Sequence, residues 1–207
     1  MMRFLLSMFR PAAIFACAVA ATAASAQEAP DALVKRVSQE VMQIVKTDPK
    51  VQAGDRQRIR EVIEAKLFPN FDFERMTALA MGRNWRQATP EQQKQLIEQF
   101  QTLLVRTYSG ALSQYRDQTM DYKPLRVDPA ATDVTVRTEV VRAGGAPVQI
   151  DYSLEKKLAG WKAYDVIVGG VSLVTNYRDE FNEQIKNGGI DGLIKTLATK
   201  NQGPAPK

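Results

Sequence analysis

The chain has 207 residues, with 28 basic side chains against 23 acidic ones, a formal net charge of +5 and no histidine. Zinc sites that depend on histidine ligands are therefore excluded. The lysines and arginines do not form a dense cluster with interleaved aromatic residues, so nucleic-acid binding is not expected.

An export signal is expected over residues 1–26. Two arginines lie near its start, an apolar run follows over residues 11–24, and small side chains precede a cleavage point after Ala26. The run is shorter than the roughly 20 residues that span a bilayer, which disfavours the alternative of a retained membrane anchor. Cys17 lies inside it. Cleavage would leave 181 residues with a net charge of +3 and no cysteine, which excludes a cysteine hydrolase and a thiolate-bound zinc site.

The remaining length suits one domain with a sizeable core, which we place at residues 27–200. Residues 201–207, rich in asparagine, glycine and proline, are expected to form a disordered tail. The modest positive charge permits a loose electrostatic approach to anionic membrane surfaces, which salt would weaken.

The first half of this domain has the apolar period of helices. Helices are expected over residues 33–45 and 55–67, and a third over residues 72–82, with an aspartate as its cap. Residues 89–92 combine a threonine cap, a proline and a glutamine in the spacing of a capping box. The helix that they start runs through Tyr115 and is predicted to be the longest element, with a broad apolar face.

The second half changes to the alternating pattern of strands. Strands are predicted over residues 132–141, 148–154 and 161–168, joined by turns at residues 143–146 and 156–160. Together they would form an antiparallel meander of three or four strands.

Helices return at the end of the domain. One is predicted through Phe181 and Ile185 and closed by two glycines at residues 188–189, and a short last helix is predicted over residues 190–198. The predicted fold class is α+β, with helices packed on one face of a curved antiparallel sheet.

Several segments, taken in order over nearly the whole expected domain, carry a family resemblance. They are residues 71–76, 82–92, 100–108, 160–166 and 170–178. These segments resemble the MlaC, or toluene-tolerance, family of periplasmic phospholipid-binding proteins.

That resemblance implies a cone-like fold similar to nuclear-transport-factor domains, with an internal apolar cavity. It implies a periplasmic carrier that exchanges phospholipid with an outer-membrane MlaA–porin complex and with MlaD of the inner-membrane MlaFEDB ABC transporter, and so maintains outer-membrane lipid asymmetry. The family also implies a monomer that meets membrane complexes transiently, has no enzymatic activity and needs no cofactor beyond its bound phospholipid.

Physical chemistry is consistent with such a carrier. A diacyl phospholipid hides about 30 methylene groups in a bilayer, each contributing about 0.8 kcal/mol, so free passage through water costs on the order of 20 kcal/mol. A carrier must replace the bilayer with an apolar cavity. Transfer of the lipid from the membrane into such a cavity is nearly neutral in free energy. The net direction of lipid transport would then be set by the partner complexes.

Ten side chains are expected to line the space between helices and sheet. They are Leu104, Tyr108, Val136, Val140, Ile150, Tyr152, Val166, Val168, Val171 and Leu173. Each could instead pack as dry core without a ligand, and the sequence leaves both possibilities open.

Two other classes of function compete with a carrier. An isomerase-like enzyme could use an aspartate base and a tyrosine donor, and Asp151, Asp165, Tyr152 and Tyr164 supply these types. Strict strand alternation, however, places the two aspartates on the face opposite both tyrosines. The third possibility is a structural periplasmic adaptor with a filled core.

Overall fold

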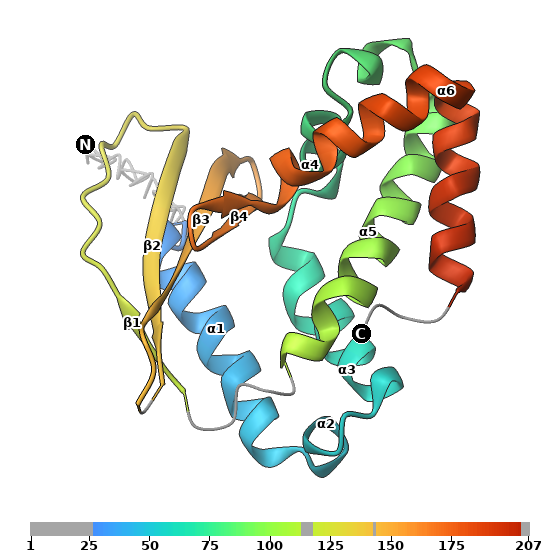
Figure 1. The fold of residues 1–207 in the computed structure, drawn as a ribbon. Helices are drawn as coiled ribbons and strands as arrows, with labels where there is room; N and C mark the ends of the chain where they lie inside the picture. Colours follow the sequence, from blue (N-terminus) through green and yellow to red (C-terminus); the bar gives the residue numbers. More distant parts are fainter. Residues whose placement is uncertain (1–26, 113–117, 143, 204–207) are drawn as a thin grey trace, which may run out of the picture.

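A computed structural model describes residues 27–112, 118–142 and 144–203. A five-stranded antiparallel sheet lies beside a group of helices (Figure 1). Each strand pairs with the next one in sequence, in the order β1-β2-β3-β4-β5. The predicted α+β class is confirmed.

The bounds of the elements follow the chain. The helices are α1 (Pro30–Thr47), α2 (Pro49–Gln52), α3 (Arg56–Val62), α4 (Phe73–Met81), α5 (Pro90–Leu112) and α6 (Leu173–Gln202). A π-helical turn and two 3-10 turns are η1 (Ile63–Leu67), η2 (Phe68–Asn70) and η3 (Gly82–Gln87). The strands are β1 (Thr119–Tyr122), β2 (Asp133–Val141), β3 (Val148–Lys157), β4 (Gly160–Val168) and β5 (Val171–Ser172).

Local capping chemistry explains where the helices begin. The Asp72 carboxylate accepts a hydrogen bond of 2.8 Å from the backbone amide of Arg75 and caps α4 as predicted. At the start of α5, the Thr89 amide donates to Gln92 Oε1 at 3.0 Å, and the Gln92 amide donates to Thr89 Oγ1 at 3.2 Å. This reciprocal pair is the predicted capping box.

Helix α6 consists of two helical arms that meet at a kink. The run of 30 residues is interrupted at Gly189, whose backbone is not helical (φ 67°, ψ −173°), so the predicted separation into two helices at residues 188–189 is confirmed. In Figure 1 the second arm of α6 turns back beside α5. The 23-residue α5 is the longest uninterrupted helix described, as predicted, and the second arm of α6 continues through Gln202, two residues into the segment assigned to the tail. The predicted end of α5 at Tyr115 lies outside the described residues.

A β-bulge breaks the alternation of β4. Ser153 pairs with Asp165 and Leu154 with Ala163, so Tyr164 is an extra residue without a partner position on β3. Tyr164 packs against the helices α4 to α6, whereas Tyr152 packs against the cluster between α1 and the sheet. The expectation that both tyrosines share one face is therefore wrong.

Three apolar clusters hold the elements together. The largest lies between α4, α5 and α6 and contains Met76, Ala80, Met81, Ala88, Leu96, Phe100, Leu103, Leu104, Val174, Tyr177, Phe181, Leu193 and Leu197. The second joins the first half of α1 to the sheet and contains Leu33, Val34, Val37, Val136, Leu154, Trp161 and Ala163. The third joins the second half of α1 to α2, α3 and η1 and contains Val41, Val45, Val51, Ile59, Val62 and Ile63.

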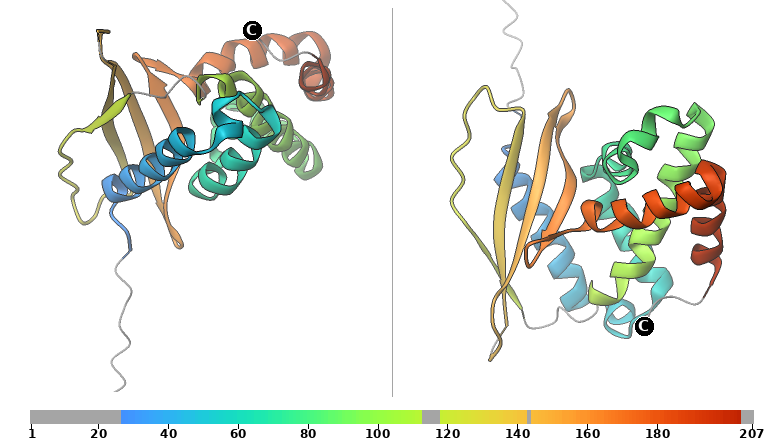
Figure 2. Two further views of the ribbon diagram at one scale, coloured as in Figure 1. Left: turned by 90° about the horizontal axis from the view of Figure 1, so that it is seen from below. Right: turned by 45° about the horizontal axis from the view of Figure 1, so that its top comes forward.

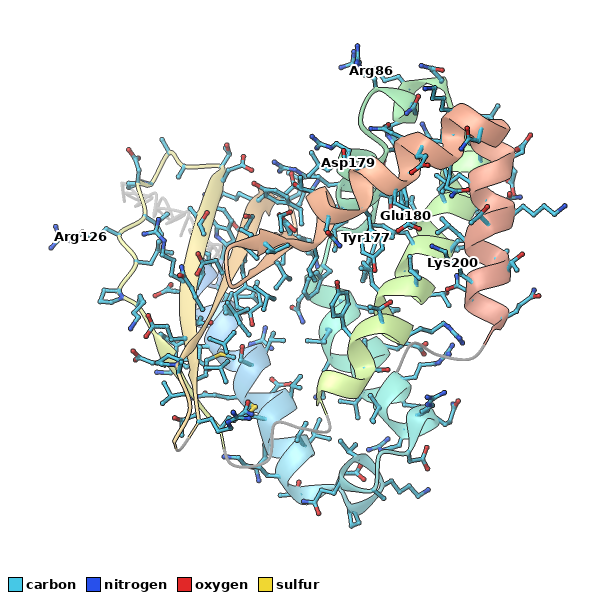
Figure 3. All side chains as sticks on the ribbon, in the orientation of Figure 1. Arg86, Arg126, Tyr177, Asp179, Glu180 and Lys200 are labelled. Carbon is cyan, nitrogen blue, oxygen red and sulfur yellow. The ribbon has the colours of Figure 1, made fainter. Side chains whose placement is uncertain are left out.

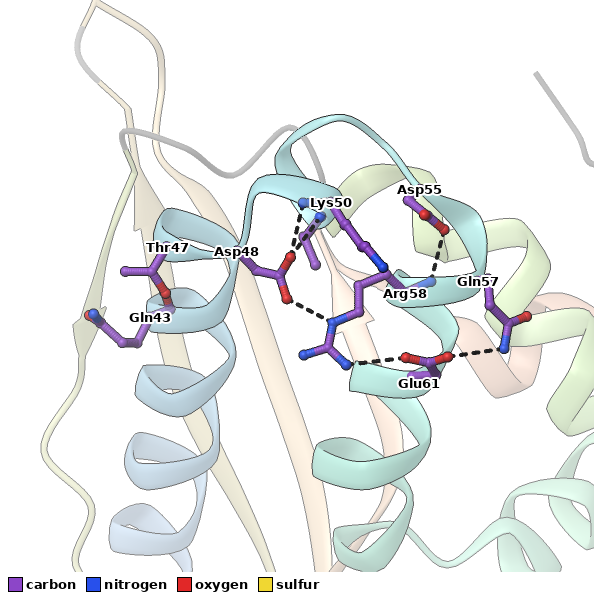
Figure 4. A network of polar contacts seen from close by, with 9 residues as sticks. Gln43, Thr47, Asp48, Lys50, Asp55, Gln57, Arg58 and Glu61 are labelled. Atoms are coloured by element: carbon purple, nitrogen blue, oxygen red, sulfur yellow. Dashed lines mark hydrogen bonds and ion pairs between the residues drawn. The ribbon is translucent and has the colours of Figure 1, made fainter.

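Helix α1 thus connects the sheet, which its first half contacts, to the helices α2 and α3, which its second half contacts. Figure 2 shows it on the side of the sheet where the other helices lie. Polar contacts fix its end: the Asp48 carboxylate accepts from two amides of α2 and from Arg58 Nε of α3 at 2.7 Å, and Arg58 also pairs with Glu61 (Figure 4). Helices α4 and α6 meet the sheet at β4.

Candidate functional site

The strand residues predicted to line a cavity share one face of the sheet. Register places Val136 opposite Tyr152, which in turn lies opposite Val166 on β4. Ile150 lies opposite Val168, two positions further along. Directly paired residues project to the same side, so these side chains and Val140 form a largely apolar surface across three strands. Thr138 shares this face, and its hydroxyl donates to the carbonyl of Ile150 at 2.7 Å.

Burial is uneven over this surface. Val136, Val140 and Ile150 are buried, whereas Tyr152 and Val166 are partly buried. Val168 lies at the rim and is 36% exposed. Helix α1 covers the part of the face that holds Val136, through the second cluster, so dry packing explains the burial of this residue.

Leu104 and Tyr108 lie on α5, among the side chains that pack against α6. Leu104 is a buried member of the large cluster, and Tyr108 packs on its edge. Burial, together with the neighbouring Tyr177 hydroxyl and a hydrogen bond to it, raises the pKa of Tyr108 to about 12. Tyr177 points from α6 into the helix group and meets Phe100 edge to face, with ring centroids 5.2 Å apart (Figure 3). Tyr108 is therefore a neutral hydroxyl in an apolar setting at neutral pH.

The segment after β4 holds the remaining two candidates. Gly169 and Gly170 have φ angles of 57° and 84°, a region that favours glycine, and they turn the chain into β5. Val171 follows and is 57% exposed, whereas Leu173 is partly buried. Val148, at the same end of the sheet, is 43% exposed. Exposed valines thus border the buried part of the sheet face.

Asp165 fixes the start of α6, a role that the sequence analysis did not identify. Its carboxylate accepts hydrogen bonds from Ser172 Oγ at 2.6 Å and from the amides of Val166 at 2.9 Å and Val174 at 3.2 Å. Ser172 is itself the N-cap of α6. The negative charge also complements the positive end of the helix dipole. The signal in the sequence was an aspartate seven positions before a serine cap.

Arg75 joins the helices to the sheet. Its guanidinium lies 3.6 Å from the centre of the Tyr164 ring, and it pairs with Asp133 at 2.8 Å and with Glu155. Lys157 pairs with both Asp72 and Glu155 at 2.8 Å. Burial alone would raise the pKa of Asp72, but hydrogen bonds from the Arg75 amide and from Lys157 outweigh it, and the pKa is lowered.

The aspartates and tyrosines that an acid–base site would use are present, but Asp165, Tyr164 and Asp151 contact other groups. Hydrogen bonds occupy both carboxylate oxygens of Asp165, and the Tyr164 ring lies against Arg75. Gln149 donates to one oxygen of Asp151 at 2.9 Å. None of these contacts forms the aspartate–tyrosine pair of an isomerase.

The described residues contain neither a cluster of metal-ligating side chains nor a membrane-spanning helix. Within residues 27–112, 118–142 and 144–203, no three acidic or cysteine side chains gather around a possible metal position. In the same ranges no helix is long and apolar enough to cross a bilayer. Two of the basic side chains, Arg86 and Arg126, lie far apart, Arg86 at one end of the helix group and Arg126 beside the sheet (Figure 3).

Comparison with known proteins assigns the family. A family model described as "MlaC protein" matches residues 35–199, which is most of the chain. The chain belongs to the MlaC family. The resemblance stated from the sequence segments is thereby confirmed.

Individual MlaC relatives match over most of their length. The "Toluene tolerance protein ttg2D" of Pseudomonas putida is 27% identical over 173 residues, covering 83% of this chain and 80% of the relative. The "Intermembrane phospholipid transport system binding protein MlaC" of Haemophilus influenzae is 22% identical over 184 residues, covering 87% and 86%. A solved phospholipid-binding protein from Ralstonia solanacearum, in complex with a phospholipid, is 43% identical with a TM-score of 0.78; the match covers 83% of this chain and 96% of that one.

Proposed function

We propose that this protein is a phospholipid carrier that holds the acyl chains of a diacyl phospholipid in an apolar cavity. The observation that carries the proposal is the similarity to the Ralstonia solanacearum protein, which has the same fold at 43% identity and was solved with a phospholipid. Such identity over nearly the whole of that chain supports a common type of ligand.

The acyl chains would lie between α5 and the shared face of the sheet. Leu104 and Tyr108 would form the helix side, and Val136, Val140, Ile150, Tyr152, Val166 and Val168 the sheet side. Val171 and Leu173 would lie where the chains enter, since Val171 is exposed on the turn that follows β4. An apolar lining suits this ligand because methylene groups need no hydrogen-bonding partner.

The place of action would be the periplasm, after removal of residues 1–26. The protein would exchange phospholipid with an MlaA–porin complex at the outer membrane and with MlaD of the MlaFEDB transporter at the inner membrane. This role is supported by the name of the Haemophilus influenzae relative, an intermembrane phospholipid transport system binding protein. It requires no catalysis, because the lipid leaves unchanged.

Lipid extraction tests the proposal directly. Protein purified from a Gram-negative host should release a single diacyl phospholipid per molecule on organic extraction, and native mass spectrometry should show the same mass increment. Protein that carries no lipid and catalyses isomerisation would contradict the carrier, as would an interior filled by its own side chains.

Val171→Asp should lower lipid occupancy, because a charge at the entrance disfavours the passage of acyl chains. Val171 is 57% exposed, so the substitution should leave folding intact. Ala53→Asp provides the matched control, since Ala53 is exposed between α2 and α3, away from the sheet. Equal occupancy in both variants and the wild type would show that Val171 does not border the entrance.

A further inference from the structure

The turn between β3 and β4 presents an apolar side chain where a polar one is usual. Leu158 and Ala159 occupy the turn, and Leu158 is fully exposed. Gly160 follows with a φ of 130° and completes the reversal. Such turns normally contain asparagine, aspartate, serine or glycine, which hydrogen-bond with water or with their own backbone. The turn geometry itself therefore does not require a leucine at this position.

Lysines surround this leucine. Lys156 and Lys157 precede it and Lys162 follows it on β4. Lys157 is neutralised by Asp72 and Glu155. The Lys162 ammonium donates to the carbonyl of Pro69, which does not cancel its charge. Lys156 is exposed and forms no ion pair with any residue in the described ranges. Two uncompensated positive charges thus lie beside one exposed apolar side chain.

The start of the domain lies at the same place. Gln27, the first residue after the expected cleavage point, donates from Nε2 to the carbonyl of Lys157 at 3.0 Å. A cleft of about 810 Å³ adjoins the turn, and Lys156, Leu158 and Lys162 are among its lining residues. Arg36 also lines it but is neutralised by Glu28 at 2.8 Å. The turn, this cleft and the start of the described chain therefore lie together at one end of the sheet.

We propose that the β3–β4 turn, residues 156–162, is a docking surface for an anionic phospholipid bilayer. Leu158 enters the interface between headgroups and acyl chains, and Lys156 and Lys162 meet the lipid phosphates. One apolar side chain or a few charges alone give marginal membrane binding, whereas the two together give binding that remains reversible. Reversible contact suits a protein that must leave the surface again.

This docking surface is separate from the proposed lipid entrance. Strand β4 runs from Gly160 at the docking turn to Val168, next to Gly169 and Gly170 at its other end. Membrane docking and cargo binding can therefore be measured independently, and failure of one does not imply failure of the other.

Vesicle binding tests the proposal with the chain lacking residues 1–26. Wild-type protein should sediment with vesicles of three parts phosphatidylcholine to one part phosphatidylglycerol, much less with phosphatidylcholine alone, and less at high salt. Lys156→Glu should weaken binding at least about fivefold, as expected for loss of one lysine near an anionic surface. Leu158→Asp should do the same while keeping its phospholipid cargo. Lys186→Glu, an equal charge change at an exposed site on α6, is the control.

Insertion can be followed at a single position, because the chain after residue 26 has no cysteine. An environment-sensitive fluorophore on Leu158→Cys should shift to the blue with anionic vesicles, and the same label on Lys186→Cys should not. The proposal is overturned if neither vesicle type binds, if Lys156→Glu and Lys186→Glu bind equally, or if both labels shift alike. Binding only to a protein partner would also overturn it.

Discussion

Asp165 illustrates how a single side chain organises the region next to the candidate entrance. Its carboxylate joins β4, β5 and the first turn of α6 through three hydrogen bonds. Only about 9% of the residue is exposed, so water does not replace these partners when the carboxylate is removed. Loss of a charged acceptor in such a position leaves buried donors without partners.

Asp165→Ala should therefore lower the free energy of unfolding by about 2–3 kcal/mol. Asp179→Ala on the exposed side of α6 is the matched control and should change it by less than about 0.5 kcal/mol. Urea unfolding followed by circular dichroism measures both values. Equal stability of the two variants would mean that the hydrogen bonds of Asp165 contribute nothing net.

Tyr164 shows why residue positions on β4 could not all be read from the sequence. Its neighbours alternate well enough to predict a strand, yet the bulge shifts Tyr164 to the helix side. The contact that accompanies the shift is the guanidinium of Arg75, which is 89 positions earlier in the chain. Such a contact between distant segments has no local signature.

At the scale of elements, the kink in α6 depends on two adjacent glycines with different roles. Gly189 has φ 67° and ψ −173°, a combination that only glycine adopts without strain. Gly188 has no positive φ, and a Cβ atom added there would meet no atom within 4 Å. The two positions therefore respond in opposite ways to the same substitution.

Gly189→Ala should destabilise the protein by about 1–3 kcal/mol because the alanine must adopt a strained backbone conformation. Gly188→Ala should be neutral or stabilise it by up to about 1 kcal/mol, since alanine is favoured over glycine in helices. Thermal unfolding of the two variants side by side checks the prediction. A destabilisation of similar size in both would indicate that α6 tolerates no change at its bend.

Helix starts were predictable because their chemistry is local. Asp72 and Thr89 lie within three residues of the amides that they cap, and both predictions are confirmed. The candidate lining residues were predictable only in part. Alternation correctly places Val136 and Tyr152 on one face of the sheet, but their exposure depends on where α1 crosses, which strand periodicity does not contain. Their contact with lipid stays a prediction.

At the scale of the whole molecule, a charged network holds the helices against the sheet. Asp72 on the helix side pairs with Lys157, which also pairs with Glu155, and Glu155 pairs with Arg75. Because the pKa of Asp72 in the folded protein lies below that in the unfolded chain, its stabilising effect is complete above pH about 4. It is lost as the pH falls through the folded value.

Stability should therefore decrease as the pH is lowered from about 5 to 3, and this decrease should be smaller in Asp72→Asn. The variant keeps a capping side chain but loses the charge, so at neutral pH it should be less stable by about 1 kcal/mol. Urea unfolding at a series of pH values measures both effects. Asp179→Asn serves as the control, and a parallel pH profile for wild type and Asp72→Asn would contradict the prediction.

The position of α6 in the chain determines when the largest cluster can form. Phe181, Leu193 and Leu197 come from the two arms of α6, the last element described, whereas the sheet needs only pairings between consecutive strands. During synthesis from the N-terminus, hairpins can therefore close while α4 and α5 still present apolar side chains to water. A premature stop codon within α6 would leave the apolar side chains of α4 and α5 permanently exposed, and the truncated chain would be accessible to proteases.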